Sequence, residues 1–262
     1  MPNVSVNIGE LKRHFNKSLR CLRDYPGIPR VSNYMYDCLK SQFSDFKKQS
    51  DENNWVLDIS PQWEIPILDN RSGFSKNEHG QPNAHALIGG IVRVVDGCLS
   101  EYSFTLCLVL EDNLRGGVTA SRHCNIPSCC LGGRGDMRRI VRKFHFDINT
   151  GDQCDRPTFH FQYGGEFKEK TFYELLHYCL DHGIEKPRLP YPPFDFVLIL
   201  DLLIEQFDNL KSLDGTDWRS LVKDSQEILL RGYYTGAYNY FSCDRKKTFL
   251  EFLGEMDGPQ EE

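Results

Sequence analysis

Two short stretches in which apolar and polar residues alternate constrain the fold of this chain more than any other feature. They are residues 143–148 (KFHFDI) and 158–163 (TFHFQY). Successive side chains of a β-strand lie on opposite faces, so each stretch would have one aromatic face and one polar face. The segment between them, 149–157, is rich in the turn formers Asn, Gly, Asp and Pro. The pattern therefore predicts a β-hairpin over 138–164.

The aromatic faces of the two stretches restrict how they can pair. A shift by one residue would turn every phenyl ring to the polar side, so aromatic residues should face aromatic residues. The simplest such register sets His145 opposite His160 and Asp147 opposite Thr158, with Lys143 further along the same face. Because directly opposed residues have Cβ atoms about 5 Å apart, this register predicts two adjacent imidazoles with a carboxylate and a lysine close by.

The polar face of this hairpin has two interpretations. It could be a solvated or partner-covered surface, which is common for one face of an antiparallel sheet. It could instead be a small site, in which paired imidazoles act as acid and base on a phosphodiester or share a metal. A metal would need a third ligand, and the hairpin offers only Asp147. Attraction for a phosphate would come from four basic residues: Arg138, Arg139, Arg142 and Lys143.

A metal-dependent nuclease is a third interpretation. Asp147 is followed by Glu166 and Lys168, which is the order of an acid on one strand and a Glu-x-Lys on the next. Two carboxylates could hold a divalent cation while the lysine polarises the attacked group. Such short strings are common by chance, and Gly164-Gly165 place Glu166 beyond the predicted strand end. A divalent metal is thus the alternative to the expectation that the chain needs no cofactor.

A zinc site has weak candidates in a cysteine-containing stretch. Zinc ligands usually come in pairs about two to four residues apart. Cys124 and Cys129 fit that spacing, and His123 or Cys154 could complete a set. The sequence contains no Cys-x-x-Cys, however, so free thiols are the default expectation for its 10 cysteines.

Charge and hydropathy bound the class of partner. The net charge of −6 excludes general nucleic-acid binding, so any basic site must be local. No apolar run approaches the length needed to cross a bilayer, and the first residues (MPNVSVNIGELKRHF) lack the apolar core of a secretory signal. We therefore expect a cytoplasmic location, no membrane partner and reduced thiols.

Helical spacing of apolar residues predicts most of the remaining elements. We expect amphipathic helices over 7–23 and from about 34 to 46, and a buried helix over 84–99. A nearly all-apolar helix over 194–210 should pack on the aromatic face of the hairpin. The pair Gly89-Gly90 weakens the helix over 84–99 and could instead allow close approach of another element.

Two further segments read as strands. Residues 55–68 contain Pro61 and Pro66, which exclude a helix and a central strand, so an edge strand or an ordered arm fits best. Residues 103–110 (SFTLCLVL) are strongly apolar and predict a buried central strand.

The predicted fold class is α+β: a small antiparallel sheet around the hairpin, with helices packed on one face and at both ends. Its strands would be the following segments: about 103–110, 139–148 and 157–163. Residues 1–50 would form an N-terminal helix pair and 51–262 the α+β core domain, or a single domain would span 1–257 with a disordered acidic tail after it.

Several short strings occur together: HFD at 145–147, PTFHFQYG at 157–164, PRLPYPP at 187–193, WEIP at 63–66 and ALIG at 86–89. With these strings the chain resembles uncharacterised bacterial proteins of about this length that are associated with mobile or phage-defence operons. The resemblance spans much of the chain and implies a multi-component antiviral system, with this chain as effector or accessory subunit and a protein partner encoded nearby. It carries over no catalytic residue.

The sequence thus predicts foremost an accessory or interaction subunit. It would bind a protein partner, or the phosphate of RNA or DNA, through the polar face of 138–164. The alternative is a nuclease that uses His145 and His160, or Asp147 and Glu166 with a metal. Neither interpretation fixes the oligomeric state.

Overall fold

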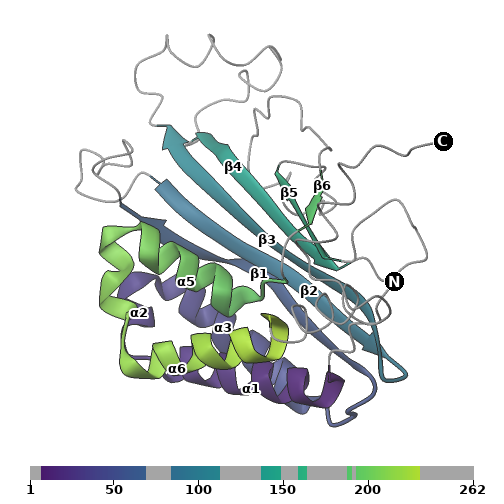
Figure 1. The fold of residues 1–262 in the computed structure, drawn as a ribbon. Helices are drawn as coiled ribbons and strands as arrows, with labels where there is room; N and C mark the ends of the chain where they lie inside the picture. Colours follow the sequence, from purple (N-terminus) through teal and green to yellow (C-terminus); the bar gives the residue numbers. More distant parts are fainter. Residues whose placement is uncertain are drawn as a thin grey trace, which may run out of the picture.

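The centre of the protein is a six-stranded antiparallel sheet in which the strands follow their order in the chain. The computed structural model describes residues 7–68, 84–112, 137–148, 159–163, 188–190 and 193–230. The strands are β1 (Trp55–Ile67), β2 (Ala84–Val95), β3 (Cys98–Asp112), β4 (Met137–Ile148), β5 (Phe159–Tyr163) and β6 (Arg188–Pro190). The helical segments are α1 (Ile8–Asp24), α2 (Ile28–Val31), α3 (Asn33–Lys48), α5 (Phe196–Gln206), η2 (Asp208–Leu213), α6 (Thr216–Ser225) and η3 (Gln226–Leu230). The longer helices lie in a layer on one face of the sheet (Figure 1), which confirms the predicted α+β class.

The two helices predicted near the N-terminus are confirmed as α1 and α3. Each begins with a capping side chain, since Asn7 accepts a hydrogen bond from the backbone N–H of Glu10 and Ser32 accepts one from Met35, both at 3.1 Å. Each buries its apolar stripe: Leu11, Phe15, Leu19 and Leu22 in α1, and Met35, Leu39, Phe43 and Phe46 in α3. These residues belong to one hydrophobic cluster that also includes the sheet and α5.

The helix predicted over 84–99 is wrong, because these residues form β2 and the start of β3. The chain turns at Asp96-Gly97, where φ is 52° and 73°. An Asp-Gly pair with positive φ at both positions is typical of a two-residue hairpin turn. The run before it is rich in Ile and Val, which favour strands. A continuous apolar run does not by itself distinguish a buried helix from a buried strand.

The glycine pair in β2 allows other side chains to cross the strand. A Cβ on Gly90 would lie 2.3 Å from the ring of Phe104 and 2.7 Å from the carbonyl oxygen of Ser103. A Cβ on Gly89, which faces the opposite side, would lie 2.6 Å from Cγ of Gln62. Both glycines therefore allow residues of the neighbouring strands to approach closely, which was the alternative role expected for Gly89-Gly90.

The predicted edge strand and the predicted central strand are both confirmed. Residues 55–67 form β1, the first strand of the sheet. The register of its pairing with β2 shifts between Ile59 and Trp63, the stretch that contains Pro61. Residues 103–110 lie within β3, between β2 and β4.

Side-chain amides from the helical layer bind the backbone along the outer edge of β1. Gln49 donates to the carbonyl oxygen of Val56 at 2.8 Å and accepts from its N–H at 2.7 Å. The other contacts are from Gln42 to the carbonyl of Pro61 (2.8 Å), from Asn209 to the carbonyl of Pro66 (2.9 Å) and from the N–H of Leu68 to Asn209 (2.8 Å). These amides satisfy backbone groups that an edge strand would otherwise expose.

The predicted all-apolar helix is confirmed as α5, followed by the 3₁₀ segment η2. Phe196 at its start is fully buried, with ring centroids 5.6 Å from Phe15 and 6.1 Å from Phe104. Just before the helix, Phe194 stacks on Phe146 of β4 at 5.1 Å. The start of the segment, at Phe194, therefore packs on the aromatic face of the hairpin as expected, whereas α5 itself contacts mainly β2, η2 and α6.

Candidate functional site

The predicted hairpin is present as β4 and β5, but its register differs from the expected one by two residues. His145 pairs with Gln162, and His160 pairs with Asp147, so the direct opposition of the two histidines is wrong. The observed register forms three apolar pairs: Phe144 with Tyr163, Phe146 with Phe161, and Ile148 with Phe159. The expected register would have formed two and set Ile148 opposite Pro157. The additional apolar pair favours the observed register, and a shift by two keeps the aromatic residues on one face.

The polar face of β3 and β4 holds an imidazole between a hydroxyl and a carboxylate. Nδ1 of His145 lies 3.1 Å from Oγ1 of Thr105, its neighbour on β3, and 3.8 Å from Oδ1 of Asp147. The side chains of His145 and Asp147 are 20% and 27% exposed, so the group is accessible but partly shielded from water. We call Thr105, His145 and Asp147 the β4 polar site.

The two ring nitrogens of His145 differ in this site. Both contacts fall on Nδ1, and Nε2 has no hydrogen-bond partner among the residues that the structure describes. If the neutral ring carries its proton on Nδ1, Nε2 keeps a lone pair that can accept a proton. If the ring is protonated, Nε2–H is a donor for an anion. The same arrangement can thus bind a phosphate or transfer a proton.

The four basic residues predicted to attract phosphate do not all reach this site. Lys143 is 3% exposed, and Cys107, which pairs with it on β3, is 0% exposed. Lys143 is therefore a buried residue rather than a surface cation. Arg142 is exposed and, as the preceding residue, faces the other side of β4. The backbone of Arg138 and Arg139 pairs with β3, and their side chains are outside the described part.

The remaining predicted site residues lie outside the described residues. They are Glu166, Lys168, His123, Cys124, Cys129 and Cys154, and the side chain of His160 is likewise not described. Within 7–68, 84–112, 137–148, 159–163, 188–190 and 193–230, no group of three His, Cys, Asp or Glu residues is arranged to hold a metal ion. The metal-dependent alternatives stay predictions.

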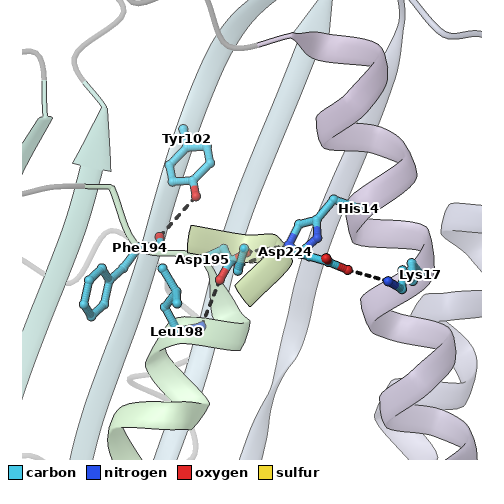
Figure 2. A network of polar contacts seen from close by, with 8 residues as sticks. His14, Lys17, Tyr102, Phe194, Asp195, Leu198 and Asp224 are labelled. Carbon is cyan, nitrogen blue, oxygen red and sulfur yellow. Dashed lines mark hydrogen bonds and ion pairs between the residues drawn. The ribbon is translucent and has the colours of Figure 1, made fainter. Parts of the chain in front are cut away.

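A second polar cluster lies inside the helical layer and was not foreseen. Figure 2 shows His14 of α1 directed at Asp195, the residue before α5. Nε2 of His14 lies 2.9 Å from Oδ2 of Asp195 and 3.1 Å from Oγ of Ser225, and Ser225 also donates to Asp195. The other carboxylate oxygen, Oδ1, accepts from the backbone N–H of Leu198 at 2.9 Å.

This Ser-His-Asp cluster does not have the geometry of a hydrolase triad. In such a triad the carboxylate binds one ring nitrogen and the serine the other, so that a proton can pass through the ring. Here Ser225 and Asp195 both contact Nε2 of His14. All three residues are also 0–3% exposed, which leaves no access for a substrate. The cluster is a structural tie between α1, the N-cap of α5 and the end of α6.

One part of this tie left a signal in the sequence. Asp195 precedes an apolar run and follows Pro192-Pro193, which is a typical N-cap context. Its contacts with His14 and Ser225 join residues 181 and 30 positions away in the chain, and no local pattern encodes such contacts.

Comparisons with known proteins give no indication of what the site does. No protein-family model matches the chain, and neither the curated proteins nor the solved structures gave a significant match. Among the described residues, no helix is both long and apolar enough to cross a membrane.

Proposed function

We propose that this chain is an interaction subunit that binds a phosphate-bearing partner through the β4 polar site. The observation that carries the proposal is the orientation of His145, whose Nδ1 is occupied by Thr105 at 3.1 Å while Nε2 has no partner in the described part of the chain. A protonated imidazole held in this way presents one directed N–H to an anion.

The overall charge supports a local contact rather than an extended one. The chain carries a net charge of −6, so a long nucleic-acid path over its surface would be repelled. A single directed donor on a partly shielded sheet face suits one phosphate, on RNA, on DNA or on a modified protein. The assignment of the partner to a bacterial antiviral system rests on the sequence resemblance alone.

Binding can be tested with a matched pair of histidine variants. Fluorescence anisotropy would measure the affinity of the purified protein for labelled single-stranded RNA and DNA at low and moderate salt. His145→Ala should weaken binding by a factor of about 10 to 100, because a hydrogen bond to a charged group contributes about 1.5–3 kcal/mol. His85→Ala is the control, since His85 lies on β2 beside Glu64, 3.1 Å away, and should leave affinity unchanged.

One set of binding results would contradict the proposal. If His145→Ala and wild type bind every labelled strand and a phosphopeptide with equal affinity, or neither binds any of them, then the β4 polar site is not a phosphate-binding surface. The unfolding temperature of both variants should stay close to that of the wild type, because neither histidine is in the hydrophobic core.

Phosphodiester cleavage is the second candidate function. For it, the observed register favours a site built around Asp147 over one built on two directly opposed histidines. Asp147 is directly opposite His160 and two residues from His145, so one carboxylate is adjacent to two histidine positions. Incubation of labelled RNA and DNA with the protein tests this candidate. Cleavage that His145→Ala abolishes would support it, and loss of cleavage on addition of a chelator would favour the metal-dependent form with Asp147.

A further inference from the structure

A cleft of about 1080 Å³ opens between α1, α2, η2 and α6. It is separate from the β4 polar site, because its lining includes no residue of β3 or β4. Its volume is slightly above the range of about 300–1,000 Å³ that is usual for small-molecule sites. Its lining combines basic residues with an apolar floor.

Two of the charged groups at this cleft are already paired within the fold. Asp24 accepts two hydrogen bonds from Arg23, each at 2.7 Å, and Arg23 also lies over the ring of Phe43 at 4.3 Å. Lys17 forms an ion pair with Asp224, which Figure 2 also shows. These two pairs are neutral and contribute little net field to the cleft.

Two arginines lining the cleft are not paired in this way. Arg20 forms only a loose ion pair with Asp24, in which its Nε is 4.0 Å from the carboxylate, beyond hydrogen-bond distance, and its side chain is 73% exposed. The guanidinium of Arg30 in α2 has no ion pair or hydrogen bond with any residue in the described part of the chain. Among the described residues of the lining, the remaining charged group is Asp217, so Arg20, Arg30 and Asp217 together carry a net positive charge. A guanidinium group with free N–H donors is suited to bidentate contact with phosphate or carboxylate.

The apolar part of the lining is fixed in position. Leu221 is 3% exposed, and Val31 and Pro66 also belong to the lining. The hydroxyl of Tyr25 donates to the carbonyl oxygen of Leu213 at 2.8 Å, which holds the Tyr25 ring at the wall. An apolar surface next to guanidinium groups with N–H donors left to offer is the combination that suits small organic anions.

We propose that this cleft binds a small organic anion, with a phosphate or carboxylate group between Arg20 and Arg30 and an apolar portion against Val31, Pro66 and Leu221. This site is independent of the β4 polar site, so either can be present without the other.

Cys21 provides a reporter for occupancy of the cleft. It lines the cleft and is partly buried, and burial raises the pKa of its thiol above the usual 9.0. A ligand in the cleft would cover this thiol and slow its alkylation. Cys98, which is exposed at the turn between β2 and β3, is an internal reference in the same molecule.

The experiment is peptide-level mass spectrometry of maleimide labelling on the full chain at mildly alkaline pH. The probes are phenyl phosphate, benzoate and the neutral benzyl alcohol. An anion at about twice its dissociation constant should slow labelling of Cys21 about threefold, in proportion to 1 + [L]/Kd, and leave Cys98 unaffected. Benzyl alcohol should protect much less. Protection by phenyl phosphate alone identifies a phosphate site, and protection by benzoate alone identifies a carboxylate site.

Two variants with the same change in charge complete the test. Arg20→Ala/Arg30→Ala should abolish protection, and both residues are exposed, so the fold should be retained. Arg13→Ala/Lys40→Ala removes two exposed cations outside the cleft and should keep protection. The proposal is overturned if neither anion protects Cys21, if benzyl alcohol protects equally well, or if protection persists without Arg20 and Arg30.

Discussion

Nε2 of His14 lies 2.9 Å from Oδ2 of Asp195, although 181 residues separate them in the chain. With Ser225, these residues join the first helix of the protein to the beginning of α5 and the end of α6 (Figure 2). All three are shielded from water, and hydrogen bonds in such an environment are costly to break because the freed groups find no other partner.

Asp195→Ala should therefore be among the most destabilising changes of a polar residue in the protein. It removes the N-cap of α5 and takes away the carboxylate that both His14 and Ser225 contact, so that at least one buried donor is left without an acceptor. We expect the free energy of unfolding to fall by about 3 kcal/mol, from about 1 kcal/mol for the cap and about 1–3 kcal/mol for the orphaned donors. Urea unfolding followed by circular dichroism measures it.

The control for this change is Asp37→Ala, which removes an exposed carboxylate from α3. It should alter the free energy of unfolding by no more than about 0.5 kcal/mol. An equally small effect of Asp195→Ala would show that the tie between the three helices contributes nothing to stability.

Tyr102 should make stability depend on alkaline pH. Burial, together with the nearby charge of Asp195, raises the pKa of Tyr102 well above the usual 10.0. Its hydroxyl donates to the carbonyl oxygen of Phe194 at 3.2 Å. The unfolded chain loses this proton near pH 10 while the folded chain keeps it, so the stabilisation is complete below about pH 10 and is lost as the pH rises further.

Tyr102→Phe separates this effect from other titrations. The variant should be less stable than wild type by about 1 kcal/mol at neutral pH, because it lacks the hydrogen bond. Above about pH 10 the difference should shrink, since only the wild type has the phenol to titrate. Denaturant unfolding across that pH range, with Tyr34→Phe at a 48% exposed position as control, would reveal a constant difference if the proposed cause is wrong.

Gly90→Ala should destabilise the sheet by overpacking. The new methyl group would meet the ring of Phe104 at 2.3 Å and the backbone oxygen of Ser103 at 2.7 Å. Since the backbone oxygen cannot move freely, we expect a loss of about 1–3 kcal/mol in thermal or urea unfolding. Gly9→Ala in the first turn of α1 is the opposite case, because its Cβ would have no neighbour closer than 3.6 Å. It should be neutral or stabilising by up to about 1 kcal/mol.

Gln49→Ala should weaken the attachment of α3 to the sheet. It removes both hydrogen bonds to the backbone of Val56, at 2.8 and 2.7 Å. Because water can replace part of this pairing at an edge strand, we expect a loss of only about 1–2 kcal/mol. Lys47→Ala, at an exposed position of the same helix, is the control. Faster hydrogen exchange at the Val56 amide in Gln49→Ala, and not in the control, would locate the effect.

The sequence predicted the parts of the fold that a local repeat encodes. Strict alternation over 143–148 gave a strand with the correct apolar face, and the prolines at 61 and 66 marked β1 as an edge strand. The prediction failed over 84–99, where a continuous apolar run carries no period. Asp96-Gly97 between two apolar runs was the local signal for a hairpin there.

The candidate site was predictable only in part, for a related reason. Side-chain alternation fixes which face His145 occupies, but it does not distinguish registers that differ by two residues. Counting the apolar pairs that each register forms would have chosen the observed one. The contact of His145 with Thr105 and the tie at His14 depend on strands and helices brought together by the whole fold, and a single sequence does not show such contacts.

The distance in sequence between His14 and Asp195 also affects how the protein is made. On the ribosome, α1 is synthesised first, and at about 5–20 residues per second roughly 10–40 s pass before the 181 later residues have been added. During that time the first helix has neither its buried acceptor nor the aromatic partner Phe196. A nascent chain that stops before Ser225 therefore leaves buried side chains of α1 without their partners, so this helix can complete its packing only after α5 and α6 have been synthesised.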